Sequence, residues 1–356
     1  MTRTLLTDLS DLARLGADAL IDVRSPAEFA EDRVPGAVNL PVLDDAERAR
    51  VGTVYVQESR FRARRLGAAL VARNAARHLE GWLADKPASW RPLVYCWRGG
   101  MRSGSFATIL RAVGWRVEVL EGGYRSWRRL VVRTLYEGAL PWRLVLLDGN
   151  TGTGKTEVLA RVAARGGQVV DLEALAAHRG SLFGAVAGGQ PAQKGFESAL
   201  AAALAGCDPS RPVLLEAESA RLGALTLPPA VWAAMRAAPR IEIAAPLSER
   251  VALTARIYAD IAADPARLSA TLDRLRPFHP RETVERWQSL AADGAVATLA
   301  AELMTAHYDP RYARSRTDAP PAARLEGDSL DGPGLDRLAD AVLEVLAAPL
   351  PRTGPS

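Results

Sequence analysis

The first stretch of the chain whose residue types can perform chemistry is a cysteine followed by two glycines and two arginines. An apolar run predicts a buried strand directly before Cys96, and the ends of such strands are where open α/β sheets place their chemistry. Gly99 and Gly100 permit a tight backbone whose N–H groups can surround the sulfur, and Arg98 and Arg102 add positive charge. We therefore predict a reactive thiolate at Cys96 that meets an anion. The alternative is a buried core cysteine, but such a cysteine does not require two glycines and two arginines beside it.

A second candidate site is a glycine-rich segment that reads G-x-x-x-x-G-K-T over residues 149–156. It lies between an apolar run at 143–148, which predicts a strand, and a helical pattern, and this is the context of a phosphate-binding loop. The glycines let the backbone wrap a diphosphate, Lys155 can reach the outer phosphate, and Thr156 can ligate Mg²⁺. The predicted phosphate-contacting residues are Gly149, Gly152, Gly154, Lys155 and Thr156.

Polar residues follow two further predicted strands. The apolar run that begins at Pro212 ends in Glu216 and Glu218, which can hold a metal ion or a water molecule, although capping a helix is an equally good role. Another strand is predicted over residues 168–173, ahead of His178 and Arg179. A lone His-Arg-Gly segment usually indicates an exposed loop, and contact with phosphate or RNA is the alternative.

Composition narrows the class of protein. The 356 residues are 48% apolar and 24% charged, which is typical of a folded globular protein, and the length suggests two domains. No apolar run approaches a membrane span, and no secretory signal is evident at the start, so no membrane association is expected. Two cysteines exclude a disulfide framework and favour a cytoplasmic location. The net charge of +4, carried almost wholly by arginine, suits phosphate or RNA, but it also reflects genome composition in many proteins.

Four ordered segments of the N-terminal half resemble the rhodanese family. They are D-V-R-x-x-x-E-F at 22–29, V-P-G-A-x-N-x-P at 34–41, the cysteine loop at 96–103 and G-G-Y at 122–124. The resemblance implies an α/β fold with an N-terminal rhodanese-like domain, which we assign to residues 1–135. A linker at 136–142 and a P-loop NTPase-like domain with a parallel sheet and a C-terminal helical part, at 143–350, complete the predicted organisation.

The length of the cysteine loop leaves more than one chemistry open. Five residues separate Cys96 from Arg102, one more than in many sulfur-transfer rhodaneses and the spacing of cysteine-dependent phosphatases. Such a loop can hold a tetrahedral oxyanion over the thiolate with backbone N–H groups and a bidentate arginine. The loop is therefore compatible with a phosphatase and with transfer of sulfur or selenium from a phosphate-bearing donor. A further alternative is a kinase-like nucleotide enzyme in which the rhodanese half is a scaffold.

Motifs in both halves together resemble the family of bacterial tRNA 2-selenouridine synthases. They are C-W-R-G-G-M-R-S at 96–103, D-L-E-x-L-A-x-H-R-G-S-x-F-G at 171–184, Q-P-x-Q-x-x-F-E at 190–197, E-x-E-S at 216–219 and H-Y-D-P-x-Y at 307–312. The resemblance implies a transferase that replaces the sulfur of a wobble 2-thiouridine in the tRNA anticodon stem-loop by selenium from selenophosphate. It also implies an S-geranyl intermediate made from geranyl diphosphate. Both compounds are expected co-substrates, and an enzyme that supplies selenophosphate is an expected partner.

The resemblance also suggests roles for the site residues. Cys96 would serve the selenium-transfer step, while Arg98, Arg102 and the amides of Gly99 and Gly100 would hold selenophosphate or the developing anion. The phosphate loop would hold a diphosphate, and its motif leaves open whether that diphosphate belongs to geranyl diphosphate or to a nucleotide.

Contact with tRNA is expected from arginines interleaved with aromatic residues, because RNA loops are held by phosphate contacts and base stacking. The candidates for phosphate or tRNA contact are Trp97, Arg125, Arg128, Arg129, His178, Arg179, Tyr308 and Tyr312. Trp97, next to the cysteine, can stack on the target base. A helical pattern over residues 58–84 carries arginines on one face, for which a solvated surface is the simpler interpretation and RNA contact the alternative.

Overall fold

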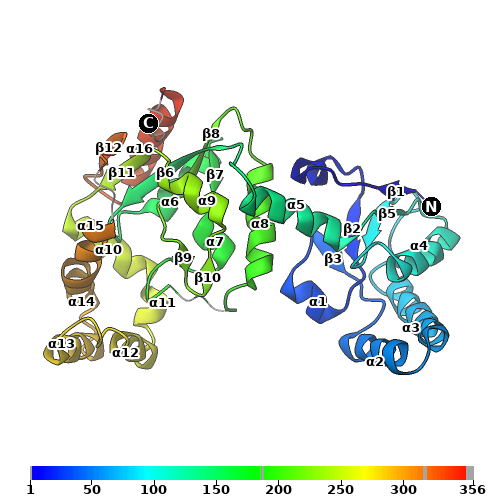
Figure 1. Ribbon diagram of the computed structural model, residues 1–356. Coiled ribbons are helices and arrows are strands. Elements are labelled where there is room, and N and C mark those ends of the chain that lie inside the picture. Colours follow the sequence, from blue (N-terminus) through cyan, green and yellow to red (C-terminus); the bar gives the residue numbers. More distant parts are fainter. Residues whose placement is uncertain (1, 185, 187, 316–318, 350–356) are drawn as a thin grey trace. The chain divides into compact units, whose positions relative to one another are not determined.

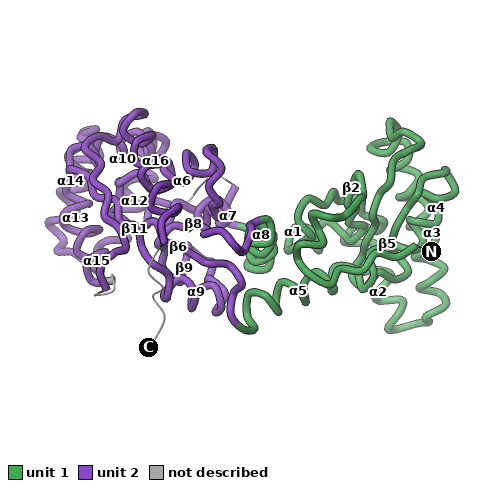
Figure 2. The backbone as a smooth tube through the Cα atoms, turned by 90° about the horizontal axis from the view of Figure 1, so that it is seen from above, with its two compact units in different colours: residues 1–138, 191–206 green, residues 139–190, 207–356 purple. Residues whose placement is uncertain are grey.

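The computed structural model describes residues 2–184, 186, 188–315 and 319–349, and Figure 1 shows it as a ribbon. The chain forms two compact units, which are coloured separately in Figure 2. Unit 1 comprises Met1–Gly138 and Pro191–Gly206, and unit 2 comprises Ala139–Gln190 and Cys207–Ser356. Residue 350, the end of the predicted C-terminal domain, lies outside the described residues.

Unit 1 is built on a parallel five-stranded sheet in the order β1-β5-β4-β2-β3. Its strands are β1 (Arg3–Thr4), β2 (Ala19–Asp22), β3 (Ala37–Asn39), β4 (Pro92–Tyr95) and β5 (Glu118–Leu120). Its helices are the 3₁₀ helix η1 (Leu9–Arg14), α1 (Pro26–Glu31), α2 (Asp45–Gln57), α3 (Arg60–Glu80), α4 (Met101–Val113), α5 (Tyr124–Tyr136) and α8 (Gln193–Ala205). The predicted strand before Cys96 is β4, which is buried along its whole length in the middle of this sheet.

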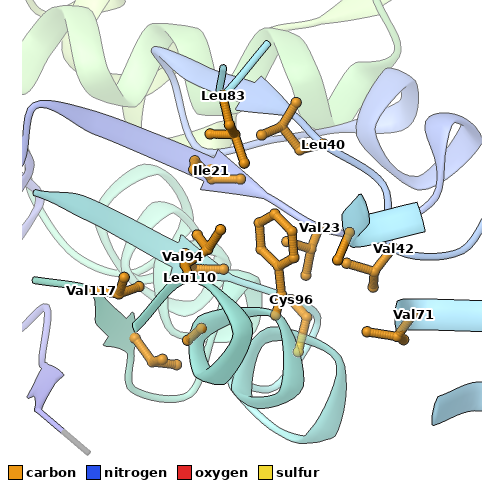
Figure 3. Packing of buried hydrophobic residues seen from close by; sticks show 14 of the residues in the cluster. Ile21, Val23, Leu40, Val42, Val71, Leu83, Val94, Cys96, Leu110 and Val117 are labelled. Atoms are coloured by element: carbon orange, nitrogen blue, oxygen red, sulfur yellow. The ribbon is translucent and has the colours of Figure 1, made fainter. Parts of the chain in front are cut away.

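The core of unit 1 surrounds the end of β4. Cys96 belongs to this core together with Val23, Val42 and Val71, and Figure 3 shows their side chains. Val71 comes from α3, which forms most of the helix predicted over residues 58–84 and begins after Ser59, whose hydroxyl accepts a hydrogen bond from the N–H of Arg62 at 3.4 Å. The cysteine is therefore fixed by packing from the strand side and from a covering helix.

Helix α8 packs with unit 1, although the sequence-based boundary at 136–142 assigned its residues to the C-terminal domain. Its Glu197 accepts hydrogen bonds from the guanidinium of Arg128 and, at 2.6 Å, from the hydroxyl of Tyr136. The indole N–H of the buried Trp127 donates to the hydroxyl of Ser198 at 3.1 Å. These buried polar contacts with α5 explain why a segment distant in sequence belongs to the N-terminal unit.

Unit 2 is built on a second parallel five-stranded sheet, in the order β12-β11-β6-β8-β7. Its strands are β6 (Arg143–Gly149), β7 (Gln168–Val170), β8 (Pro212–Glu216), β11 (Arg240–Ala244) and β12 (Ala323–Glu326), and β9 (Arg221–Leu222) pairs separately with β10 (Leu225–Thr226). The helices next to these strands are α6 (Lys155–Ala164), α7 (Leu172–Ala176), α9 (Pro229–Arg236) and α16 (Gly332–Ala347). The strand predicted over 168–173 was too long, because the carboxylate of Asp171 accepts from the N–H of Ala174 and starts α7.

The predicted helical part of unit 2 follows β11. It contains α10 (Leu247–Ile257), α11 (Ala259–Ala262), α12 (Pro265–Asp273), α13 (Arg281–Ala292), α14 (Val296–Leu303), the π-helix η2 (Met304–Tyr308) and α15 (Asp309–Ser315). These helices enclose a core of their own around Leu272 and Trp287, both fully buried. None of the described helices combines the length and apolar character that crossing a bilayer would require.

Candidate functional site

The sulfur of Cys96 lies at the carboxyl end of β4 and is surrounded by hydrogen-bond donors. The N–H of Gly100 points at Sγ from 3.3 Å, and the hydroxyl of Ser103 donates to it from 3.2 Å. Gly100 caps α4, so the sulfur also lies at the positive end of this helix dipole. Hydrogen-bond donors and a helix N-terminus can stabilise negative charge that develops at this position during a reaction.

The turn at Gly122 and Gly123 packs against the backbone of the cysteine loop. The N–H of Tyr124 donates to the carbonyl of Cys96 at 2.9 Å. Gly99 has a φ of 65°, and a Cβ at this position would lie 2.5 Å from the carbonyl oxygen of Leu120. The close approach of the two turns therefore requires glycine and fixes the loop geometry.

The two arginines of the loop have different surroundings. Arg102 forms a two-pronged ion pair with Glu28, with distances of 2.7 and 3.3 Å, and Arg48 of α2 contacts the same carboxylate at 3.0 Å. Burial alone would raise the pKa of Glu28, but the hydrogen bond and charge of Arg102 hold it below its ordinary value. Arg98 is exposed and makes no hydrogen bond or ion pair with any residue that the structure describes. Of the two arginines predicted to bind an anion, Arg98 has no ionic partner among the described residues, whereas Arg102 is paired with Glu28.

Trp97 borders the loop and is 37% exposed, so part of its ring is accessible. Its ring lies 5.2 Å from that of Tyr124, whose hydroxyl donates to Asp32 at 2.5 Å. Below Tyr124, the guanidinium of Arg24 lies 4.0 Å from the ring centroid and is paired with the buried Asp22. This buried network holds the orientation of Trp97.

The three arginines of α5 that were predicted to contact phosphate or tRNA differ in exposure. Arg125 and Arg129 are exposed, whereas Arg128 is partly buried and pairs with Glu197 of α8. A hollow of about 700 Å³, part of it open solvent, is lined by Gly100 and Met101 next to the cysteine and by Arg3, among others. Arg3 was not singled out from the sequence, because a lone arginine near the N-terminus carries no motif.

The phosphate loop of unit 2 connects β6 to α6. Gly152 and Gly154 adopt left-handed conformations, with φ values of 82° and 78°. The ammonium of Lys155 donates to the carbonyl of Gly149 at 2.8 Å and lies 5.5 Å from the ring centroid of Tyr312. Although burial alone would lower the pKa of Lys155, Tyr312 and then the carboxyl groups of Glu218, Glu173 and Asp148 raise it above its ordinary value, so the residue is positively charged. Thr156, the second residue of α6, is exposed.

Three glutamates surround the phosphate loop. Glu173 accepts from the hydroxyl of Thr156 at 3.2 Å, and burial, followed by repulsion from Glu218, raises its pKa to about 7. Burial also raises the pKa of Glu218 and, further, that of Glu216, which accepts from the N–H of Leu172 at 3.2 Å. Among the described residues, no three His, Cys, Asp or Glu side chains form a ready-made metal site.

An apolar cavity begins at the phosphate loop. It contains about 600 Å³ of empty space, part of it open to solvent, and its lining is almost entirely apolar. The lining includes Thr151 of the phosphate loop, Phe183, Tyr258, Leu299, Met304 and Tyr308.

The H-Y-D-P-x-Y motif connects this cavity to the phosphate loop. Tyr308 lines the cavity, and Tyr312 faces Lys155. Asp309 pairs with Arg250 at 2.6 Å, and Arg250 in turn donates to the carbonyl of Thr151 at 2.9 Å. His307 completes the motif with a hydrogen bond of 2.8 Å to His279. The contacts of Asp309 and Tyr312 thus connect the helical part of unit 2 to the phosphate loop.

Arg179 contacts a residue that lines the cavity, and both His178 and Arg179 are partly buried. Arg179 pairs with Asp260 at 3.1 Å and lies 5.3 Å from the ring centroid of Tyr258. Burial lowers the pKa of His178, and its Nδ1 is buried without a hydrogen-bond partner in the described part of the chain.

Residues that the sequence did not single out include Glu173, Arg250 and Tyr258. Glu173 was part of the D-L-E motif, so a search for acids next to the loop could have found it. Arg250 and Tyr258 carried no local signal, because their positions become meaningful only when α10 packs against the phosphate loop.

Two family models match the chain. A rhodanese-like domain matches residues 5–130, and the AAA domain of tRNA 2-selenouridine synthase matches residues 142–274. Together with the two parallel sheets, these matches confirm the predicted fold class.

Curated relatives cover more of the chain. The tRNA 2-selenouridine synthase of Hahella chejuensis is 40% identical over 249 residues, which are 68% of this chain and 64% of that protein. That of Cupriavidus necator is 36% identical over 344 residues, 88% of this chain and 92% of that protein. A solved rhodanese-related protein from Thermoplasma volcanium is 18% identical, covers 36% of this chain and 92% of its own, and has a TM-score of 0.23, too low to support an argument. The near full-length match to the Cupriavidus protein shows that the chain belongs to the tRNA 2-selenouridine synthase family.

Proposed function

We propose that this protein replaces the sulfur of a wobble 2-thiouridine in tRNA by selenium, and that it does so through an S-geranyl intermediate. The family membership supports the overall reaction, since the relatives bear the name of this activity. Selenophosphate is the proposed selenium donor at the cysteine loop, and geranyl diphosphate is the proposed alkyl donor at the phosphate loop. An enzyme that produces selenophosphate is then a necessary partner, and the cytoplasm is the proposed compartment.

The apolar cavity that begins at Thr151 is the observation that carries the geranyl step. A nucleotide base would need hydrogen-bonding groups for its polar edges, and the lining offers almost none. An isoprenoid chain needs only apolar surface, and each buried carbon contributes about 0.8 kcal/mol. A ligand with a diphosphate on the phosphate loop and a ten-carbon chain in the cavity satisfies both parts of the site.

The first step is alkylation of sulfur. The thiouridine sulfur attacks the first carbon of the geranyl group, the carbon–oxygen bond breaks, and diphosphate leaves. The amides of the phosphate loop and the ammonium of Lys155 would stabilise the charge that develops on diphosphate. The thiouridine loses its N3 proton, and Glu173, with a pKa of about 7, is the carboxylate suited to accept it at neutral pH.

A magnesium ion fits the residues beside the phosphate loop. The hydroxyl of Thr156 is an oxygen ligand of the kind that Mg²⁺ prefers, with the remaining positions left to phosphates and water. When bound, the ion would neutralise charge on the leaving diphosphate.

The second step exchanges selenium for the alkylated sulfur: a carbon–selenium bond forms, geranyl thiol leaves, and hydrolysis of the phosphorus–selenium bond releases phosphate. Alkylation turns the sulfur into a thiol leaving group, which departs more readily than sulfide. The donors around Cys96 Sγ and the unpaired guanidinium of Arg98 support binding of a selenophosphate-sized anion at the cysteine loop. Cys96 is the proposed participant in selenium transfer.

A three-component reaction tests this proposal. The protein is incubated with 2-thiouridine tRNA, geranyl diphosphate and selenophosphate, and the nucleosides are analysed by mass. Omission of selenophosphate should leave the S-geranyl nucleoside, and the complete mixture should yield 2-selenouridine. Selenium incorporation that is independent of geranyl diphosphate would refute the geranyl intermediate while leaving the overall exchange intact.

A further inference from the structure

An exposed surface of unit 1 is formed by the end of α2 and the start of α3. Helix α2 contains no buried residue. Val56 and Phe61 are 83% and 74% exposed, more than any other large hydrophobic side chain that the structure describes. Tyr55, which like Val56 belongs to α2, is also exposed. Large apolar side chains held in water at a helix turn indicate a site of contact with another molecule.

The same surface carries positive charge. Arg64 and Arg65 are exposed and form no hydrogen bond or ion pair within the described ranges of the chain. The guanidinium of Arg60 lies 5.7 Å from the ring centroid of Tyr55. Residues four positions apart are neighbours on the surface of a helix. Phe61 therefore lies next to Arg65 on α3, and Arg60 lies next to Arg64. The α2–α3 surface, as defined here, consists of Tyr55, Val56, Arg60, Phe61, Arg64 and Arg65.

The α2–α3 surface belongs to the unit that holds the cysteine. Arg48 of α2 and Arg102 of the cysteine loop contact the same carboxylate, that of Glu28. Helix α3 also contributes Val71 to the core that contains Cys96 (Figure 3). A molecule bound on this surface is therefore attached to the same rigid body as the reactive sulfur.

We infer that the α2–α3 surface binds the single-stranded anticodon loop of the substrate tRNA. This inference rests on the proposed function, which makes tRNA the substrate. Guanidinium groups pair with phosphates, and aromatic rings stack on unpaired bases, so arginines next to an exposed phenylalanine match the chemistry of an RNA loop. A second copy of the chain would offer the same excess of arginine and would be repelled, which makes it the less suitable occupant.

Binding of thiolated tRNA by the full-length protein tests the inference, measured as a function of salt. The variant that combines Arg60→Gln, Arg64→Gln and Arg65→Gln should bind at least tenfold more weakly, with a salt slope reduced by about 2. Phe61→Ala removes a stacking ring and should weaken binding about fivefold to a hundredfold. Arg116→Gln is the matched control, since Arg116 is an exposed arginine of unit 1 outside the α2–α3 surface. It should bind as the wild type does.

The outcomes separate this inference from the proposed function. If the wild type exchanges selenium and the triple variant binds tRNA with unchanged affinity and salt slope, the inference is wrong and the function stands. If Phe61→Ala converts a dimer to monomers without loss of tRNA affinity, the surface is an interface between copies, which also overturns the inference. A wild type that neither binds nor modifies tRNA would refute the proposed function itself. Because the substituted residues are exposed, an unchanged circular dichroism spectrum is expected for each variant.

Discussion

Filling the apolar cavity should separate recognition of the geranyl chain from recognition of the diphosphate. Ala255 of α10 lines the cavity and is only partly buried, so leucine at this position extends into the empty space and keeps a strong helix former. The change introduces three carbon atoms where the ligand chain would lie. If three ligand carbons lose their burial at about 0.8 kcal/mol each, binding weakens by about 2.4 kcal/mol, roughly fiftyfold.

Calorimetric titration of the Ala255→Leu variant with geranyl diphosphate and with inorganic diphosphate provides the assay. Affinity for geranyl diphosphate should fall by roughly this factor, whereas affinity for inorganic diphosphate should stay unchanged, because the phosphate loop is not altered. Ala252→Leu is the matched control on the same helix, at an exposed position outside the cavity. Equal loss of both ligands, or no loss of geranyl diphosphate, would refute the assignment of the cavity to the chain.

The remaining predictions concern the reactive groups. Cys96→Ser should abolish selenium incorporation, measured by nucleoside mass analysis, without changing geranyl diphosphate binding; a fully active variant would exclude the proposed role. Lys155→Ala removes a charged donor, worth about 1.5–3 kcal/mol, so geranyl diphosphate should bind roughly tenfold to a hundredfold more weakly and S-geranylation should stop. Glu173 has a pKa raised from 4.5 to about 7, so the stability that its protonated form provides is complete below pH 4.5 and is lost as the pH rises through about 7. In denaturant unfolding, Glu173→Gln should therefore gain stability relative to the wild type across this pH window; a pH-independent difference would contradict the raised pKa.

The two loops could be predicted from the sequence because their signals are local. A cysteine after an apolar run, followed by glycines, specifies a strand-end loop, and G-x-x-x-x-G-K-T specifies a phosphate loop, with no need for tertiary information. The boundary of the C-terminal domain was less accessible, because α8 joins unit 1 through buried contacts of Glu197 and Ser198 that no local pattern reveals. The ion pair of Arg102 could not be predicted from a local pattern either, since its partner Glu28 is 74 residues away in the sequence.

The apolar cavity could not be predicted because its lining comes from segments between Thr151 and Tyr308. In the sequence, these residues look like ordinary core positions of amphipathic helices. The π-helix over Met304–Tyr308 shows how the chain converts such positions into a site. Tyr308 at its end faces the cavity, and the next residue, Asp309, holds Arg250 against the carbonyl of Thr151.

The consecutive residues Tyr308 and Asp309 thus contact the two parts of the proposed ligand site, the apolar cavity and the phosphate loop, the latter through Arg250. A wider helical turn changes the direction of the side chains that follow it, and such turns are frequent at functional sites. Arg250 connects this turn to the phosphate loop, because its guanidinium pairs with Asp309 and donates to the carbonyl of Thr151. The diphosphate and the chain of one ligand would then be recognised by a single connected structure, which is the arrangement that a prenyl diphosphate requires and a free phosphate does not.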